Sequence, residues 1–330
     1  MIRTIPADRT WPNIALISDI TYKNEDSWYG ETQRPLKLSV LMPKHREECK
    51  PMPLLLWLCG GNFQVVDHNI WIPEMVDYAR RGFIVASAEY RTVNDVPYPA
   101  PLVDVKAAIR YLRAHKERYC IDDRYIFVMG ESAGAALACY AGILKDPALD
   151  QGDFLEVSSA VSGVIDLYGP VDFRLDFENV REHPAKHGAY LQRTMAFPNE
   201  DGSPSEADPL ALSHITPDTP PFLILHGTGD EKVPLKQSDD LYATLTEKGV
   251  PADYIRIEGA IHGEDSFYQP RIVDLVVEFM NRIVNDLELT GPAPPGLPGP
   301  RGPESDKREF HPVKPPSASA AAQAAEIVSR

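Results

Sequence analysis

A short glycine-rich turn, Gly130-Glu131-Ser132-Ala133-Gly134, constrains the fold of this chain more than any other stretch. Residues 125–129 before it are apolar and rich in strand-forming types, and residues 133–139 after it are mostly small and compatible with a helix. Small residues on both sides allow a strand to turn sharply into a helix and leave the serine exposed at the turn. The pattern therefore predicts a strand-turn-helix unit in which the positive end of the helix dipole faces Ser132.

Strand-length apolar runs recur along the chain and alternate with amphipathic stretches. The runs are rich in Val, Ile, Leu and Phe, as strands buried on both faces should be, and they lie at residues 36–42, 54–58, 83–88, 125–129, 161–168, 222–226 and 254–257. Between them, residues such as Leu102, Val105 and Ile109 fall at helical spacing. The alternation predicts an α/β fold with a mostly parallel sheet of about eight strands and helices on both faces.

The exposed serine requires partners, because a hydroxyl becomes a nucleophile only when a base removes its proton. Asp230 follows the run at 222–226, and His262 follows the run at 254–257. Loops at the carboxyl ends of parallel strands open on the same edge of the sheet. We therefore expect Ser132, Asp230 and His262 to meet there as a catalytic triad.

A second carboxylate, Asp172, also follows a predicted strand and is the alternative partner for His262. The small residues at 227–229 permit a tight turn toward the histidine, which favours Asp230. We interpret Asp172 as a cap at the start of the segment that follows it.

The Gly60-Gly61-Asn62-Phe63 segment follows an early predicted strand, where a loop that binds an oxyanion is expected. A tetrahedral intermediate of acyl transfer is anionic and needs preorganised N–H donors. The backbone N–H groups of Gly61, Asn62 and Ala133 are the predicted donors.

Several side chains beside this loop have a structural and a functional interpretation. We expect Cys59 to pack beneath the loop and not to act as a second nucleophile. Phe63 and Trp71 are candidates for lining a substrate pocket, although aromatic residues so near the core are as often packing residues.

These motifs resemble those of bacterial α/β-hydrolases of the feruloyl-esterase-like and acetyl-esterase group, the HGGG-type lipases and esterases. The similarity covers roughly residues 36–285 and is carried by residues 54–91, 98–112, 130–134, 167–173 and 220–262. It implies an α/β-hydrolase fold and hydrolysis of short acyl or aryl carboxylic esters without a cofactor or metal. Feruloyl or acetyl esters of plant polysaccharide fragments are the substrates it suggests.

The chain departs from the family pattern at two positions in the loop. Cys59 stands where histidine is usual, and Asn62 stands where a third glycine is usual. Asparagine tolerates a left-handed backbone better than most residues, so the loop can keep its shape.

Two other functions remain compatible with the same motifs. An amide hydrolase, such as an arylformamidase or a peptidase, would use the same triad, because the fold does not fix the leaving group. A catalytically inactive binding protein on this fold is the third interpretation, and it is disfavoured because every triad residue type is in place.

The formal net charge of -15 disfavours nucleic acid and anionic membranes as partners, since both would be repelled. A small-molecule ester is the expected partner, and association into a homo-oligomer stays open. No signal-like or membrane-spanning apolar run is evident, so a cytoplasmic location is expected. The four cysteines, Cys49, Cys59, Cys120 and Cys139, are interpreted as reduced thiols.

Residues 173–220 interrupt the strand-helix rhythm with prolines and histidines, and we expect a cap or long loop there. His183 and His187 are four residues apart, but Pro184 interrupts any helix between them and no third ligand motif follows, so no metal site is predicted.

The end of the chain differs in composition from the rest. Residues 291–330 are rich in Pro, Gly and Ala and are predicted to form a disordered tail. Residues 1–290 are accordingly expected to form a single catalytic domain.

Overall fold

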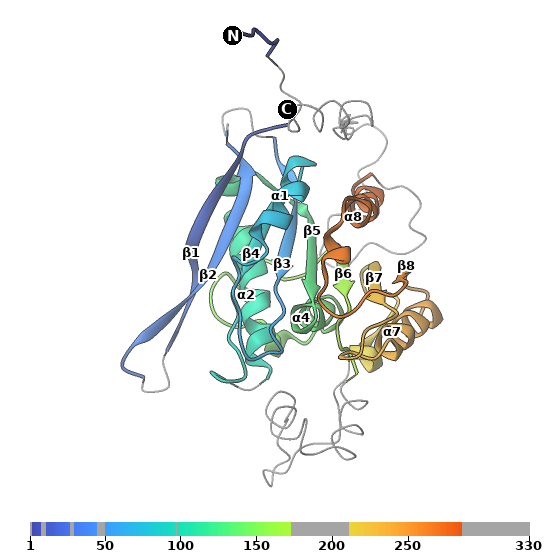
Figure 1. Ribbon diagram of the computed structural model, residues 1–330. Coiled ribbons are helices and arrows are strands. Elements are labelled where there is room, and N and C mark those ends of the chain that lie inside the picture. The colour runs from blue at the N-terminus through green and yellow to red at the C-terminus, as the bar shows by residue number, and fades with distance from the viewer. Residues whose placement is uncertain are drawn as a thin grey trace, which may run out of the picture.

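An eight-stranded sheet forms the centre of a computed structural model that describes residues 2–7, 11–26, 30–44, 50–96, 98–172 and 211–285. The strands follow one another across the sheet in the order β1-β2-β4-β3-β5-β6-β7-β8 (Figure 1). They are β1 (Ile14–Asp26), β2 (Gln33–Pro43), β3 (Met52–Leu58), β4 (Ile84–Ala88), β5 (Ile121–Glu131), β6 (Gly163–Leu167), β7 (Phe222–Gly227) and β8 (Ala252–Ile257). From β4 to β8 all neighbours pair in parallel, whereas β1 with β2 and β2 with β4 are antiparallel. The prediction of a mostly parallel sheet is confirmed.

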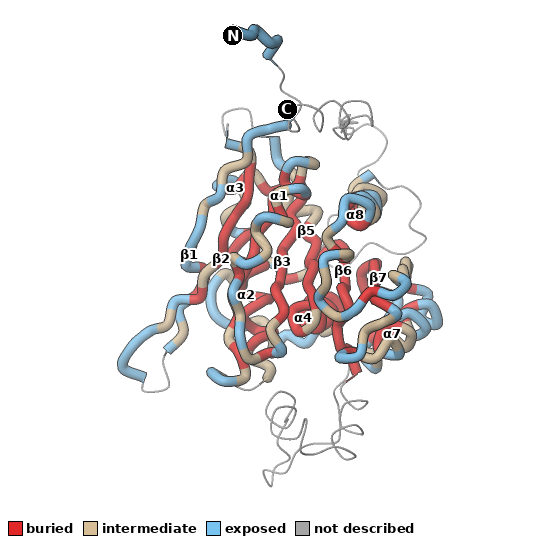
Figure 2. The backbone as a smooth tube through the Cα atoms, viewed as in Figure 1, coloured by how far each residue is buried: buried red, intermediate tan, exposed pale blue. Residues whose placement is uncertain are grey.

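Helices cover both faces of this sheet, also as predicted. They are α1 (Ile72–Arg80), α2 (Ala100–Ala114), α3 (Lys116–Tyr119), α4 (Ala133–Ile143), α7 (Lys236–Glu247) and α8 (Pro270–Val284). Helices α2, α4 and α7 share one apolar cluster with Leu54 and Leu56, and α1 and α8 share another with Leu55 and Trp57. Successive strand residues point to opposite faces, so the continuous apolar run of β3 serves both cores. Buried residues accordingly concentrate along the central strands (Figure 2).

Strand β1 is not among the runs that the sequence predicts. Only Tyr22 and Lys23 of its residues are buried, and its pairing with β2 is interrupted by two register shifts. An edge strand that is largely exposed has no continuous apolar run, which is why the sequence pattern did not reveal it.

The turn between β5 and α4 has the predicted strand-turn-helix form. Ser132 adopts φ 52° and ψ -120°, a conformation that L-residues rarely occupy. A Cβ added to Gly130 would lie 2.4 Å from the carbonyl carbon of Gly134, and one added to Gly134 would lie 2.1 Å from the Leu58 carbonyl oxygen. Both glycines are therefore required by close backbone contacts at the turn.

Some sequence predictions concern residues outside the described ranges. The predictions of a reduced thiol at Cys49, of a cap or long loop over most of 173–220 with no metal site at His183 and His187, and of a disordered tail at 291–330 fall on such residues. The end of the predicted cap is described and contains a short 3-10 helix, Ala211–His214, that precedes β7. No helix in the described ranges has both the length and the apolar character needed to cross a membrane.

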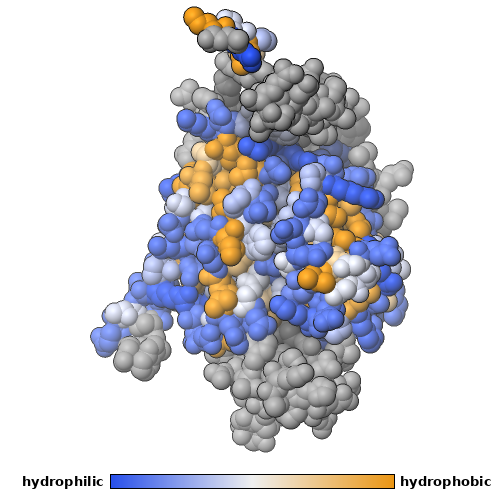
Figure 3. Space-filling model, viewed as in Figure 1, coloured by the Kyte–Doolittle hydropathy of each residue, from blue (hydrophilic) through white to orange (hydrophobic). Residues whose placement is uncertain are grey.

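Hydrophilic and hydrophobic areas both reach the face seen in Figure 3. Between β1 and α2, a group of charged side chains is largely withdrawn from solvent: Lys23 and Asp104 are buried, and Arg91 and Glu25 are partly buried. The Asp104 carboxylate is inaccessible and accepts hydrogen bonds from Lys23 Nζ at 2.7 Å and from Arg91 Nε at 2.8 Å. Arg91 also binds Glu25 at 2.7 Å. Two cations thus compensate two carboxylates, and the cluster joins the edge strand to the helical layer.

We expect Asp104→Ala to lower the free energy of unfolding by up to about 3–5 kcal/mol, because it removes one of the two carboxylates that pair with Lys23 and Arg91 and leaves both cations with Glu25 alone. Urea denaturation would measure the change. Asp240→Ala is the matched control, since its ion pair with Lys236 lies on the exposed face of α7 and such pairs contribute about 0.3–0.5 kcal/mol. Equal losses in the two variants would contradict a stabilising role for the buried cluster.

Candidate active site

The three residues predicted to form a triad lie at the carboxyl ends of parallel strands on one side of the sheet. Ser132 follows β5, Asp230 follows β7 and His262 follows β8. His262 Nε2 is 3.0 Å from Ser132 Oγ, and His262 Nδ1 is 2.7 Å from Asp230 Oδ2. The side chains therefore form one continuous chain of hydrogen bonds, although 130 residues separate Ser132 from His262.

The Asp230 carboxylate is almost inaccessible and is held on both of its oxygens. Oδ1 accepts the backbone N–H groups of Lys232 at 2.8 Å and Val233 at 2.9 Å. Oδ2 faces His262 and lies 3.4 Å from His226 Nε2. Burial alone would raise the pKa of the Asp230 carboxyl, but hydrogen bonds from His226, His262 and Val233 lower it well below its usual value.

The ionised carboxylate determines the proton position on His262. An acceptor-only group at Nδ1 requires that Nδ1 carry the proton, so Nε2 presents a lone pair. Nε2 can then accept the hydrogen bond from the Ser132 hydroxyl. This is the tautomer in which an imidazole can act as a general base toward the serine.

His226 is a residue at this site that the sequence analysis missed, because it was taken only as the end of a strand run. Its ring is fully buried at the end of β7. Nε2 is 3.1 Å from the Val233 carbonyl oxygen and Nδ1 is 2.7 Å from Ser238 Oγ. A carbonyl only accepts, so Nε2 carries the proton and Nδ1 accepts from the serine hydroxyl. A histidine in an apolar strand needs such partners, and that need was the available signal.

Asp172, the alternative acid, is buried at the end of the β6 connection, where the Gln237 side chain binds its backbone. Its N–H donates to Gln237 Oε1 at 2.8 Å, and its carbonyl accepts from Gln237 Nε2 at 2.7 Å. His262 Nδ1 is already bound to Asp230. The geometry thus brings Asp230, and not Asp172, to the histidine.

The predicted oxyanion loop follows β3 and has an unusual backbone. Gly61, Asn62 and Phe63 have φ of 130°, 60° and 57°. A Cβ on Gly61 would lie 1.9 Å from the Val65 carbonyl oxygen, so glycine is required there. Asn62 adopts the left-handed conformation that asparagine tolerates. Ala133, the third predicted donor residue, is the first residue of α4.

Glu131, the variable position of the glycine-rich turn, links this loop to other parts of the site. Its Oε1 accepts the Gly60 N–H at 2.9 Å and the Trp71 indole N–H at 3.1 Å, and its Oε2 accepts the Tyr168 hydroxyl at 2.9 Å. Trp71 stacks on the Tyr268 ring with centroids 4.4 Å apart. Whether Trp71 also lines a substrate pocket stays a prediction, and Phe63 is buried in the apolar core.

Cys59 is buried beneath the loop, with only 3% of its surface exposed. Burial raises the pKa of its thiol to about 12. Its Sγ lies 3.2 Å from the Gly60 carbonyl oxygen, and the Tyr90 hydroxyl donates to the Cys59 carbonyl at 2.7 Å. These contacts agree with a packing role.

A thiol with that pKa is ionised to a fraction on the order of 10⁻⁴ at pH 8, so Cys59 is expected to resist iodoacetamide in the native protein. Cys139 is likewise buried, and burial raises its pKa well above the ordinary value. Cys120 is partly exposed and should react first. Mass spectrometry of the three tryptic peptides would measure the order. Modification of Cys59 as fast as Cys120 would contradict this expectation.

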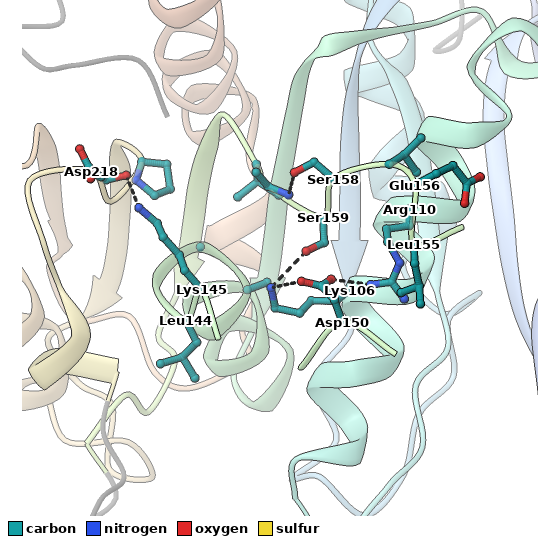
Figure 4. Close-up of a pocket in the computed structure, with 16 residues that line it drawn as sticks. Lys106, Arg110, Leu144, Lys145, Asp150, Leu155, Glu156, Ser158, Ser159 and Asp218 are labelled. Atoms are coloured by element: carbon teal, nitrogen blue, oxygen red, sulfur yellow. Dashed lines mark hydrogen bonds and ion pairs between the residues drawn. The ribbon is translucent and has the colours of Figure 1, made fainter. Parts of the chain in front are cut away.

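A cavity of about 400 Å³ is lined by Lys106, Arg110 and Lys145, among other residues (Figure 4). It includes Ala141 and Gly142 and so lies at the end of α4 opposite to Ser132. Its basic side chains already have partners. Lys106 Nζ is 3.1 Å from Ser159 Oγ, and both Lys106 and Arg110 pair with Asp150. No residue of the triad lines this cavity, which is therefore separate from it. In the described part of the chain, no group of three or more His, Cys, Asp or Glu residues could hold a metal ion.

A family model, BD-FAE, matches residues 38–245. The chain is similar to esterase LipQ of Mycobacterium tuberculosis, with 32% identity over 246 residues, covering 74% of this chain and 58% of LipQ. Esterase LipC of the same organism is 29% identical over 243 residues, covering 72% of this chain and 59% of LipC. The chain therefore spans less than two thirds of the length of these curated relatives.

The solved structures extend the comparison to the fold. A truncated carbohydrate esterase from gut microbiota superposes with a TM-score of 0.62 at 23% identity, covering 85% of this chain and 99% of that one. At this identity the likeness concerns the fold alone. Together with the strand order, it identifies an α/β-hydrolase fold.

Proposed function

The chain belongs to the BD-FAE family, and we propose that it is a serine carboxylesterase that works through an acyl-enzyme intermediate. The observation that carries the proposal is the hydrogen-bonded chain from Ser132 through His262 to Asp230. The esterases LipQ and LipC among its relatives support the same activity.

In the proposed first step, His262 Nε2 accepts the Ser132 proton while Oγ attacks the carbonyl carbon of the ester. The imidazolium that forms is stabilised by the Asp230 carboxylate 2.7 Å away. His262 then returns the proton to the departing alcohol as the carbon-oxygen bond of the ester breaks. Water, activated by the same histidine, releases the acid and restores Ser132.

We assign the stabilisation of the negative charge on each tetrahedral intermediate to the backbone N–H groups of Gly61, Asn62 and Ala133. The position of Ala133 at the start of α4 supports this role, because the positive end of a helix dipole favours an anion. The left-handed backbone at Gly61 and Asn62 supports it further, since such a turn can direct successive N–H groups into one concavity.

We assign short acyl or aryl esters as the substrate class, with feruloyl or acetyl esters of plant polysaccharide fragments as specific candidates. Exposed apolar side chains close in sequence to the site support binding of an apolar group: Val65 and Ile70 follow the oxyanion loop, and Ile261 precedes His262. Their exposed fractions are 67%, 60% and 56%.

The first test is hydrolysis of p-nitrophenyl acetate, p-nitrophenyl butyrate and methyl ferulate, with N-formylkynurenine as the amide substrate. Ser132→Ala should remove turnover and covalent labelling by a fluorophosphonate, because the hydroxyl supplies the acyl-enzyme oxygen. Circular dichroism should show a folded variant. Labelling that persists at another serine would refute the assignment of Ser132, and faster cleavage of N-formylkynurenine than of every ester would favour the amide hydrolase.

The choice of acid can be tested by two isosteric changes. Asp230→Asn should lower kcat on the order of 10⁴-fold, because asparagine permits the wrong tautomer of His262. Asp172→Asn should remain active, since its backbone is held by Gln237 and its side chain is not the partner of His262 Nδ1. Steady-state kinetics on one ester would measure both. The opposite ranking of the two kcat values would transfer the role to Asp172.

A further inference from the structure

We propose that Glu131 is a positioning residue that holds the oxyanion loop in register with the nucleophile, so that its side chain contributes to transition-state stabilisation without touching substrate. The inference rests on the proposed esterase function. Glu131 directly precedes Ser132 and occupies the first x of the G-x-S-x-G motif, a position for which the motif specifies no residue type.

The contacts of Glu131 come from three separate segments of the chain. Gly60 belongs to the oxyanion loop, Trp71 immediately precedes α1, and Tyr168 follows β6. Each donates one hydrogen bond to the carboxylate, at 2.9, 3.1 and 2.9 Å. Since Glu131 ends β5 beside Ser132, one side chain ties all three segments to the nucleophile turn.

The fit between Glu131 and the loop is close. A Cβ on Gly60 would lie 2.8 Å from Glu131 Oε1 and 3.0 Å from its Cδ, so the carboxylate occupies the space of a missing side chain. The Gly60 N–H that it binds belongs to the peptide just before the predicted donors Gly61 and Asn62. A shift of the carboxylate would therefore be transmitted directly to those donors.

The loop needs such an anchor because its own backbone conformation is costly. Asn62 and Phe63 both have positive φ, which asparagine tolerates but which a bulky residue such as phenylalanine adopts only when its surroundings enforce it. The Val93 N–H binds the Phe63 carbonyl at 2.9 Å and fixes the far end of the loop. Glu131 fixes the near end, so the strained residues are held between two anchors.

A role in filling space alone does not explain why a carboxylate, and not an apolar side chain, is buried at position 131. The residue is 9% exposed, and its hydrogen-bond partners among the described residues are neutral N–H and O–H donors. Burying a carboxylate without a cation is unfavourable, and an apolar side chain would fill the space at less cost. A side chain that ends in two polar atoms can bind all three segments, which an apolar side chain of the same size cannot.

The third contact extends the influence of Glu131 to the general base. The Tyr168 ring meets the His262 ring edge to face, with centroids 4.8 Å apart. Glu131 holds the Tyr168 hydroxyl and so positions the aromatic surface against which the imidazole packs. Glu131 thereby binds the oxyanion loop directly, precedes the nucleophile in the chain, and reaches the base through Tyr168.

The test compares Glu131→Ala with Glu131→Gln on p-nitrophenyl butyrate, and measures inhibition by phenylboronic acid, which forms a tetrahedral adduct with an active serine. Glu131→Ala should lower kcat by roughly 10–100-fold with KM changed less than about threefold, because misplaced donors weaken transition-state binding selectively. Its affinity for phenylboronic acid should fall by a similar factor. Glu131→Gln should recover most of the kcat, since its carbonyl oxygen can bind Gly60 and Trp71 while its amide donates to the Tyr168 hydroxyl.

Val276→Ala is the control for general destabilisation, because it removes buried volume from α8 with no role at the site. It should lower the melting temperature while leaving kcat and inhibition nearly unchanged. If Glu131→Ala does not fold, Tyr168→Phe replaces it. This variant removes one of the three hydrogen bonds to Glu131, and we expect kcat to fall roughly 3–10-fold at constant KM.

The proposal is overturned if folded Glu131→Ala keeps a kcat within threefold of the unchanged protein, if KM carries the loss, or if Val276→Ala reproduces the same fall. With Tyr168→Phe as the substitute, an unchanged kcat overturns it. Failure of the proposed function gives a different result, because the unchanged protein would then hydrolyse none of the esters and would not be labelled at Ser132 by a fluorophosphonate.

Discussion

The first turn of α4 packs backbone against backbone on the carboxyl end of β3, and the geometry of the site depends on this contact. A Cβ at Gly134 would lie 2.1 Å from the Leu58 carbonyl oxygen and 2.6 Å from that of Cys59. Two main chains can come so close only where one of them has no side chain. The contact brings the loop after β3 next to Ser132, and the Tyr90 hydroxyl fixes the same strand end through the Cys59 carbonyl.

The sequence predicted the parts of the site that depend on strand order. Buried parallel strands leave continuous apolar runs, so the loops that carry Ser132, Asp230 and His262 could be located from these runs and from the glycine-rich turn. The contacts of Glu131 could not be predicted, because Gly60 and Trp71 are 71 and 60 residues away from it and only the assembled sheet brings them together. The edge strand β1 was missed for the opposite reason, since exposure leaves it without an apolar run.

Helix α4, which follows the proposed nucleophile Ser132, is complemented at both of its ends. At its N-terminus, the dipole would favour the negative charge that the proposed reaction develops beside Ser132. At its C-terminus, Lys145 donates to the Asp218 carbonyl at 2.7 Å, and the same cavity contains Lys106 and Arg110. Cations near the last turn oppose the negative end of the dipole. The position of Lys145 therefore has a structural explanation in α4 itself, whereas Lys106 and Arg110 of α2 are accounted for by their pairing with Asp150.

The orientation of Asp230 fixes the proton position on His262, the proposed general base, before any substrate binds. Its Oδ1 is fixed by two backbone N–H groups, and its Oδ2 faces the N–H groups of two imidazoles, His226 and His262. Rotation of the carboxylate would break bonds on both oxygens, so the carboxylate stays in place and the pKa of Asp230 stays low. The proton on His262 is consequently held at Nδ1 by Asp230 and not by Ser132. Nε2 is left with its lone pair directed at the serine hydroxyl, which is the state that a general base must have at the start of the reaction.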